Sequence, residues 1–271
     1  MDLDAYLRRI EYDGPLRPDR ACLFALHQAH LRAIPYENLD VQFGRRVTID
    51  PAHAFEKIVT HKRGGWCYEM NGLFGWVLGQ LGFRVTRVAG AVMRSLRGDE
   101  AIANHLVLKV ELEEGLFLAD VGFGDGPLDP IAVIARPFVS HGFGFAVSRE
   151  DERWWRFHNH KAGGAASFDF HLDPADEDLL AQRCLSLQSA PDSPFVQNAV
   201  LQHHFENGVW QLRGRVLRQM MPESEKDFII ESASEYVGVL LEMFRLDLKE
   251  AADLWPKICA RHEELEAQRQ P

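Results

Sequence analysis

The sequence has 271 residues, 46% of which are apolar, enough to bury the core of one large domain or of two to three small ones. Disorder is therefore not the default interpretation, and the 26% of charged residues, 13 prolines and 21 glycines are unlike collagen, low-complexity or coiled-coil chains. The 40 acidic and 30 basic residues give a net charge of −10. Such a surface repels polyanions, which argues against a general DNA- or RNA-binding protein.

The N-terminus and the cysteines predict a soluble, cytoplasmic protein. Asp2 and Asp4 stand where a secretory signal would be positively charged, and no apolar run approaches the ~18 residues of a membrane-spanning helix. The cysteines lie far apart without a Cys-x-x-Cys pair, which favours reduced thiols over a disulfide framework or a zinc cluster. They are Cys22, Cys67, Cys184 and Cys259.

The first third of the chain predicts helices. Apolar residues at helical spacing occupy 23–34 and stop at Pro35, and a second stripe over 51–59 follows a capping aspartate and a proline. The strongest helix covers 70–81, where apolar residues recur at helical intervals up to Gly82.

After the third helix the apolar period changes to two. Strands are predicted over 84–93, 105–112 and 116–121, followed by short strands near 143–147 and 154–157. Glycines and acidic turns separate the strands, which is typical of a small barrel or a strongly curved antiparallel sheet.

The last third is mixed. Strands over 198–204 and 209–218 precede a helix that a Ser232-x-x-Glu235 capping box starts, and we expect the polar tail over 263–270 to be frayed. Because no internal repeat or long linker is present, the simplest architecture is three lobes packed on one another.

Cys67 is the strongest candidate for a nucleophile. It directly precedes the best helix, so its thiol lies at the first turn, where free N–H groups and the helix dipole favour a thiolate. Gly64 and Gly65 let the chain bend there and let a substrate approach the sulfur. A lone cysteine on a helix is more commonly a buried structural residue, but the glycines and the polar neighbours Glu69 and Asn71 favour the reactive alternative.

A cysteine nucleophile needs a base, and the base needs an acceptor that orients it. His105 opens one predicted strand and Asp120 closes the next. If a two- or four-residue loop near Glu113 joins the two strands, His105 lies directly opposite Asp120. The carboxylate of Asp120 can then accept from Nδ1–H of the imidazole, while Nε2 of the imidazole points at the sulfur of Cys67. A three-residue loop without a bulge would put the two side chains on different faces.

Other polar clusters carry weaker signals. The His-x-His at 158–160 and the His-His at 203–204 lack the spacing and the cysteine partners of a metal site, so no metal is expected. Residues 122–126 form a glycine-rich loop without the Lys-Ser/Thr of a phosphate-binding loop. It is either a flexible wall that admits a substrate beside Asp120 or an ordinary turn.

Several motifs of this sequence resemble those of the arylamine N-acetyltransferase family and occur in the same order along the chain. Residues 63–71, Arg-Gly-Gly-Trp-Cys-Tyr-Glu-Met-Asn, are similar to its Arg-Gly-Gly-aromatic-Cys-aromatic-Glu-x-Asn signature, and 34–39 to its Pro-Phe-Glu-Asn-Leu segment. Asn-His-Leu at 104–106 and Asp-Val-Gly-Phe-Gly at 120–124 resemble its His and Asp segments, and 189–195 resembles another recurring segment.

The resemblance runs over about residues 3–248 and implies an α+β fold of three lobes. These are a helical bundle over 1–84 with the cysteine, an antiparallel β-barrel over 85–188 with the histidine and the aspartate, and an α/β lid over 189–271. It also implies a core like that of cysteine proteases, at the junction of the first two lobes. The implied catalytic triad is Cys67, His105 and Asp120. The stretch 149–173 matches poorly, so no role is carried over to it.

An acceptor pocket and a coenzyme A site are implied as well. The pocket residues would be Tyr36, Val92, Phe123 and Phe195. Tyr36 departs from the family, which usually has Phe there, and the added hydroxyl could alter acceptor preference. Backbone donors of Gly124 and Gly126 would bind coenzyme A. Arg94 and Arg97 could contribute charge, although a solvated turn is the favoured interpretation of that pair.

By the same resemblance, the chain is an acyltransferase of xenobiotic metabolism. It would move an acetyl group from acetyl-coenzyme A, its co-substrate, to an arylamine, arylhydrazine or N-hydroxyarylamine by a ping-pong mechanism through an acetyl-cysteine. No permanently bound cofactor, metal, nucleic acid or membrane is expected. The side chains expected to brace the cysteine turn are Glu37, Arg63, Glu69 and Asn71.

The triad alone does not specify an acyl donor. A Cys-His-Asp hydrolase or a transglutaminase-like enzyme is therefore the nearest alternative. A non-catalytic protein that binds small molecules is another alternative, and it would leave Cys67 unreactive.

Overall fold

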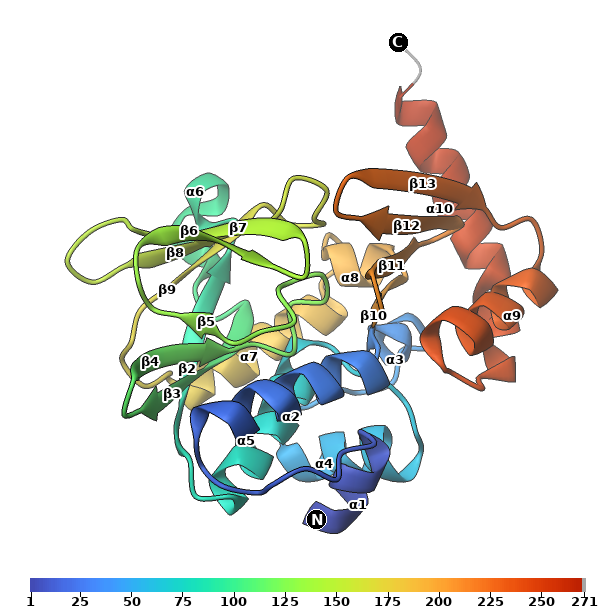
Figure 1. Cartoon of the computed structure of the whole chain (residues 1–271). Helices are drawn as coiled ribbons and strands as arrows, with labels where there is room; N and C mark the ends of the chain where they lie inside the picture. The colour runs from blue at the N-terminus through green and yellow to red at the C-terminus, as the bar shows by residue number, and fades with distance from the viewer. Residues whose placement is uncertain (270–271) are drawn as a thin grey trace.

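The structure, a computed structural model, describes residues 1–269. A helical part lies beside two antiparallel sheets, one of eight strands and one of five, as Figure 1 shows. Within residues 1–269, no helix has the length and apolar character that crossing a membrane requires.

The helical part is built by residues 3–80. Its elements are α1 (Leu3–Arg9), α2 (Arg20–Ala33), α3 (Leu39–Gln42), α4 (Pro51–Phe55), the π-helical turn η1 (Glu56–Thr60) and α5 (Cys67–Gln80). The side chains of Asp19 and Asp50 cap α2 and α4, which satisfies backbone N–H groups that have no partner inside the helix. The end of α2 just before Pro35 confirms the prediction.

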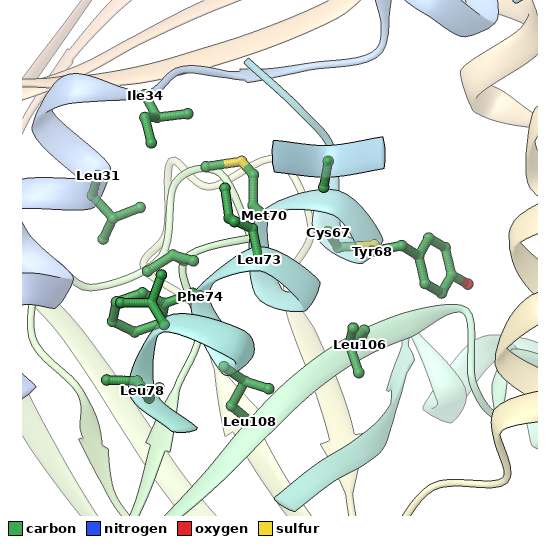
Figure 2. Packing of buried hydrophobic residues seen from close by; sticks show 14 of the residues in the cluster. Leu31, Ile34, Cys67, Tyr68, Met70, Leu73, Phe74, Leu78, Leu106 and Leu108 are labelled. Atoms are coloured by element: carbon green, nitrogen blue, oxygen red, sulfur yellow. The ribbon is translucent and has the colours of Figure 1, made fainter. Parts of the chain in front are cut away.

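Helix α5 is the central helix of this part, and its apolar stripe is the one predicted from the sequence. The helix begins at Cys67, which confirms the expected place of the thiol in the first turn. Phe74 and Leu78 are fully buried and point toward α2, where Leu31 lies (Figure 2). On another side α5 packs on the eight-stranded sheet, where Leu108 lies (Figure 2).

The eight-stranded sheet is curled and has the order β5-β4-β3-β2-β9-β8-β7-β6. Its strands are β2 (Arg84–Val92), β3 (His105–Leu112), β4 (Gly115–Ala119), β5 (Ile131–Ala132), β6 (Arg136–Ser140), β7 (Phe143–Arg149), β8 (Trp155–His158) and β9 (Ser167–Phe170). Short helices α6 (Arg94–Arg97) and η2 (Gly98–Ala101) join β2 to β3. The order ends at β5 and β6, so the predicted barrel is a half-barrel.

The five-stranded sheet has the order β1-β10-β11-β12-β13 and its own buried cluster. Its strands are β1 (Tyr36–Glu37), β10 (Val200–Phe205), β11 (Gly208–Arg213), β12 (Val216–Met221) and β13 (Ser224–Ile229). The helices of this region are α7 (Glu177–Ser189), α8 (Pro194–Gln197), α9 (Ala233–Phe244), η3 (Lys249–Leu254) and α10 (Trp255–Arg269). Strand β1 comes from the helical part, so the two ends of the chain share this sheet.

Several elements differ from the sequence prediction, among them a hairpin and two helices. The single strand predicted over 209–218 is a hairpin of β11 and β12, because Gly214 adopts a positive φ of 58° and reverses the chain. Residues 263–269 of the expected tail belong to α10, and residue 270 lies outside the described residues. Helix α7 has no counterpart in the prediction; its buried Leu180 and Cys184 join the core of the helical part.

Candidate active site

Cys67 is the first residue of α5, and the preceding turn is held against β1. Gly65 N donates to Pro35 O at 3.3 Å, and Glu37 N donates to Gly65 O at 2.9 Å. A side chain at Gly64 would overlap Pro35 O, so this close approach of two backbones requires glycine. The turn therefore fixes the direction in which Cys67 enters the helix.

A buried cluster of ion pairs braces this turn from behind. Arg63 donates to Glu37 Oε1 from Nε at 3.0 Å and from Nη2 at 2.7 Å. Lys57 Nζ lies 2.9 Å from Glu69 Oε2 and 3.0 Å from Asp40 Oδ2. Burial lowers the pKa of Lys57, but the surrounding carboxylates outweigh burial and raise this pKa above its usual range. Three of the four side chains expected to brace the turn, Glu37, Arg63 and Glu69, thus belong to this charged cluster, whereas Asn71 bonds Asp120 instead.

His105 opens β3 and Asp120 directly follows β4, and their side chains meet. His105 Nε2 lies 2.7 Å from Asp120 Oδ2, and each side chain is only 3% exposed. The prediction that the two residues lie directly opposite each other is wrong, because Leu112 pairs with Gly115 and the two-residue turn is at 113–114, one residue later than required. Asp120 lies two residues from the position directly opposite His105. Because residues two apart on a strand share a face of the sheet, the two side chains still meet as diagonal neighbours.

The imidazole faces its partners the other way round from the prediction. Nε2 contacts Asp120, which leaves Nδ1 for the thiol. Burial lowers the pKa of His105, but the charge of Asp120 and hydrogen bonds to Asp120 and Cys67 outweigh burial and raise it to about 10. Burial raises the pKa of Asp120, but His105, Asn71 and the Gly122 amide hold it below its usual range. At neutral pH the pair is an imidazolium and a carboxylate.

Asn71 and His27 hold the aspartate in place. Asn71 Nδ2 donates to Asp120 Oδ1 at 2.7 Å and to Leu106 O at 2.6 Å, and its Oδ1 accepts from Val121 N at 2.9 Å. His27 Nε2 accepts from Asp120 N at 3.1 Å. Burial lowers the pKa of His27, so the neutral form that accepts this bond is favoured.

A cavity of about 490 Å³ opens beside the sulfur. Cys67 and His105 line it, and Asp120 lies behind the imidazole. All four residues expected in the acceptor pocket line the same cavity: Tyr36, Val92, Phe123 and Phe195. Gly124 and Gly126, the expected coenzyme A donors, are not among the described residues that line it.

The glycine-rich loop at 122–126 is a wall of this cavity. The Phe123 ring packs 5.5 Å from the His105 ring, measured between centroids. Asp125 is 1% exposed and accepts hydrogen bonds from Asn159 Nδ2 at 3.0 Å and from Gly164 N at 2.5 Å. These bonds tie the wall to the segment 159–166, which the sequence could not assign.

Several lining residues were not predicted. They include Asn104, Asp125, Gly163, Gly164, Asn198, Gln202, Gln211 and Arg213. Most come from connecting segments or from β10 and β11, where only the tertiary fold brings them near the sulfur. Arg97, which the sequence offered as a possible source of positive charge, lines the cavity as well. Arg94, in contrast, is engaged by Asp99 and Asp169 and stacks on Trp154, which is a structural role.

The histidine pairs serve other purposes. His203 Nδ1 contacts Met243 O at 2.8 Å and its Nε2 contacts Arg32 O at 2.9 Å, so this side chain joins α9 to α2. His160 Nε2 lies 3.2 Å from Asp125 O. Over residues 1–269, no three His, Cys, Asp or Glu side chains gather as metal ligands would.

Comparisons with known proteins identify the family of this chain. A family profile described as N-acetyltransferase matches residues 20–253. The chain is 33% identical over 269 residues to an arylamine N-acetyltransferase of Mycolicibacterium smegmatis, which covers 93% of this chain and 94% of that protein. It is 32% identical over 246 residues to a pineal gland isozyme of arylamine N-acetyltransferase from Gallus gallus, with 81% and 83% covered.

Solved structures share the fold. The arylamine N-acetyltransferase of M. smegmatis superposes with a TM-score of 0.86 at 31% identity, over 96% of this chain and 98% of that one. The Mycobacterium marinum enzyme in complex with CoA also gives a TM-score of 0.86, at 28% identity, over 97% and 99%. The chain therefore belongs to the arylamine N-acetyltransferase family and is an acyltransferase enzyme.

Proposed function

We propose that this enzyme transfers the acetyl group of acetyl-coenzyme A to an arylamine or arylhydrazine through an acetyl-cysteine on Cys67. The observation that carries the proposal is the meeting of Cys67 and a protonated, aspartate-bound His105 at the wall of one 490 Å³ cavity. The solved relative in complex with CoA supports coenzyme A as the donor.

In the first half-reaction, the Cys67 thiolate attacks the thioester carbonyl of the donor. The first N–H groups of α5 have no carbonyl partner within the helix, so they can stabilise the negative oxygen of the tetrahedral intermediate. When that intermediate collapses, the bond to the sulfur of coenzyme A breaks. The departing thiolate takes the proton of the His105 imidazolium, and the enzyme is left acetylated with a neutral histidine.

The second half-reaction restores the starting state. The amine nitrogen attacks the acetyl-cysteine, and neutral His105 removes its proton as the bond to Cys67 breaks. The products are an amide and the original thiolate-imidazolium pair. Asp120 keeps the imidazole oriented in both steps, because its carboxylate holds Nε2 and leaves Nδ1 toward the sulfur.

The walls of the cavity suit a flat, apolar acceptor. Phe123, Phe195 and Val92 present apolar surface beside the sulfur. An aromatic ring held between such walls is positioned for attack, which compensates for the low nucleophilicity of an arylamine. The same walls exclude water, which would otherwise hydrolyse the acetyl-enzyme.

Mass spectrometry of the intact protein tests the proposal. With acetyl-coenzyme A alone, the enzyme should gain one acetyl group on Cys67 and lose it when an arylamine is added. Cys67→Ala should gain none, and Cys259→Ala, which removes a partly exposed thiol, should behave like the unmodified chain. An absence of acetylation together with cleavage of peptide amides would instead support the hydrolase.

A further inference from the structure

Tyr36 and Gln202 are a directly opposed pair in the antiparallel ladder between β1 and β10. Opposed residues in such a ladder share a face of the sheet. Both side chains line the cavity beside Cys67, and they are only 7% and 6% exposed. Two polar groups that are more than nine-tenths buried thus stand side by side on the cavity wall.

Neither side chain has a hydrogen-bond partner among residues 1–269. Other polar residues of this cavity do: the Asn104 amide bonds the backbone of Val92 in both directions, and the Asn198 amide donates to Pro194 O. Polar groups that face a cavity without a protein partner are free to hydrogen-bond a ligand there.

The surroundings of Gln202 restrict what this ligand can be. A side-chain carbon at Gly164 would lie 3.0 Å from Gln211 Nε2 and 3.4 Å from both Gln202 Nε2 and Asp125 Oδ2. Two amide donors therefore converge beside a carboxylate. A neutral oxygen is favoured there, because donors attract it, whereas Asp125 disfavours an anion.

Tyr36 lies close to the reacting centre. It forms a parallel bridge to Gly65, two residues before Cys67. A ring held between the aromatic walls with its amine at the sulfur would therefore have an edge within reach of β1 and β10.

We propose that Tyr36 and Gln202 form a specificity subsite that hydrogen-bonds a neutral oxygen, such as a carbonyl or carboxamide, on the acceptor amine. This inference rests on the proposed function, since it assigns the substrate class of that same cavity. An amide of the pantetheine arm of coenzyme A carries the same kind of oxygen, so the test must separate the two half-reactions.

The test compares Tyr36→Phe, Gln202→Leu and the double variant on two acceptors of similar shape, 4-aminobenzamide and 4-isopropylaniline. Tyr12→Phe and Gln219→Leu are matched controls, because both residues lie away from the cavity lining. Each cavity variant should lower kcat/KM for 4-aminobenzamide about tenfold, the effect of one lost hydrogen bond to a buried group. The value for 4-isopropylaniline and the rate of Cys67 acetylation by acetyl-coenzyme A should change less than twofold.

Three results would overturn the proposal. Equal losses for both acceptors would assign the pair to packing, a slower acetylation of Cys67 would assign it to the donor, and an unchanged 4-aminobenzamide rate would remove any role. Failure of the proposed function can be told apart from failure of the subsite, because the unmodified enzyme would then acetylate neither acceptor.

Discussion

Asn71 Nδ2 donates a 2.7 Å hydrogen bond to Asp120 Oδ1, which joins the helix of the nucleophile to the carboxylate that holds the base. The same amide reaches Leu106 O, next to His105. One buried side chain of α5 thus fixes the strand of the histidine and the residue after β4. This amide therefore helps to set the relative positions of Cys67, His105 and Asp120.

Replacing Asn71 by Ala should therefore lower both stability and activity. The change leaves Leu106 O, Asp120 Oδ1 and Val121 N without this partner in a fully buried place, at a cost of about 2–4 kcal/mol in the free energy of unfolding. Urea denaturation measures the loss. A variant of unchanged stability would show that the three groups find other partners.

Glu37→Gln should destabilise the protein and reduce acetyl transfer together. The change removes the carboxylate charge that faces the two Arg63 donors at Oε1, and the expected loss is about 2 kcal/mol. Glu250→Gln is the matched control, because its pair with Arg45 is almost half exposed and should contribute little. A Glu37→Gln variant of unchanged stability but without activity would contradict the bracing role.

The pair of His105 and Asp120 predicts how stability changes with pH. The pKa of His105 is about 10 in the folded protein and near its ordinary value of about 6.5 in the unfolded chain, so the folded state holds the extra proton between these values. Its contribution is complete below pH ~6.5 and is lost as the pH rises toward 10.

Asp120→Asn removes the charge that raises this pKa, so the variant should lack that part of the pH dependence. Urea midpoints of both proteins between pH 6 and pH 10 provide the measurement. The difference between them should shrink as the pH rises. Parallel curves would show that His105 is neutral at pH 7.

Gly124→Ala tests the contact between the half-barrel loop and β10. Gly124 has a φ of 89°, and a side chain there would overlap Gln202 Oε1. Gly44 has a similar φ of 70° but open space around it, so Gly44→Ala should cost only the conformational penalty of about 1–2 kcal/mol. Gly124→Ala should cost at least ~1 kcal/mol more in thermal or urea unfolding. Equal losses for the two variants would mean that Gln202 moves aside freely.

The local features of the fold could be predicted from the sequence. Cys67 was placed at a helix start because the stripe of α5 and the glycines before it are local signals. The hairpin that joins His105 to Asp120 was also predicted, but the predicted register differs from the observed one by two residues. Adjacent glutamates at 113 and 114 leave the centre of an acidic turn ambiguous. Which imidazole nitrogen faces Asp120 depends on side-chain rotation, which strand patterns do not encode.

The missing parts of the site depend on long-range contacts. Asp125 bonds Asn159 and Gly164 from another hairpin, and Gln202 reaches the cavity only because β10 pairs with β1. No short motif signals such meetings. Helix α7 escaped prediction for a related reason: few of its residues are buried, so its apolar stripe is too thin to recognise.

The pairing of β1 with β10 has a consequence for the order in which the protein matures. During synthesis Cys67, His105 and Asp120 are all made well before Val200, yet the wall that Tyr36 belongs to has no neighbouring strand until β10 exists. A ladder that joins residues so far apart in sequence forms late, since long loops must close first. The cavity beside the sulfur of Cys67 is therefore completed only when synthesis of the polypeptide is nearly finished.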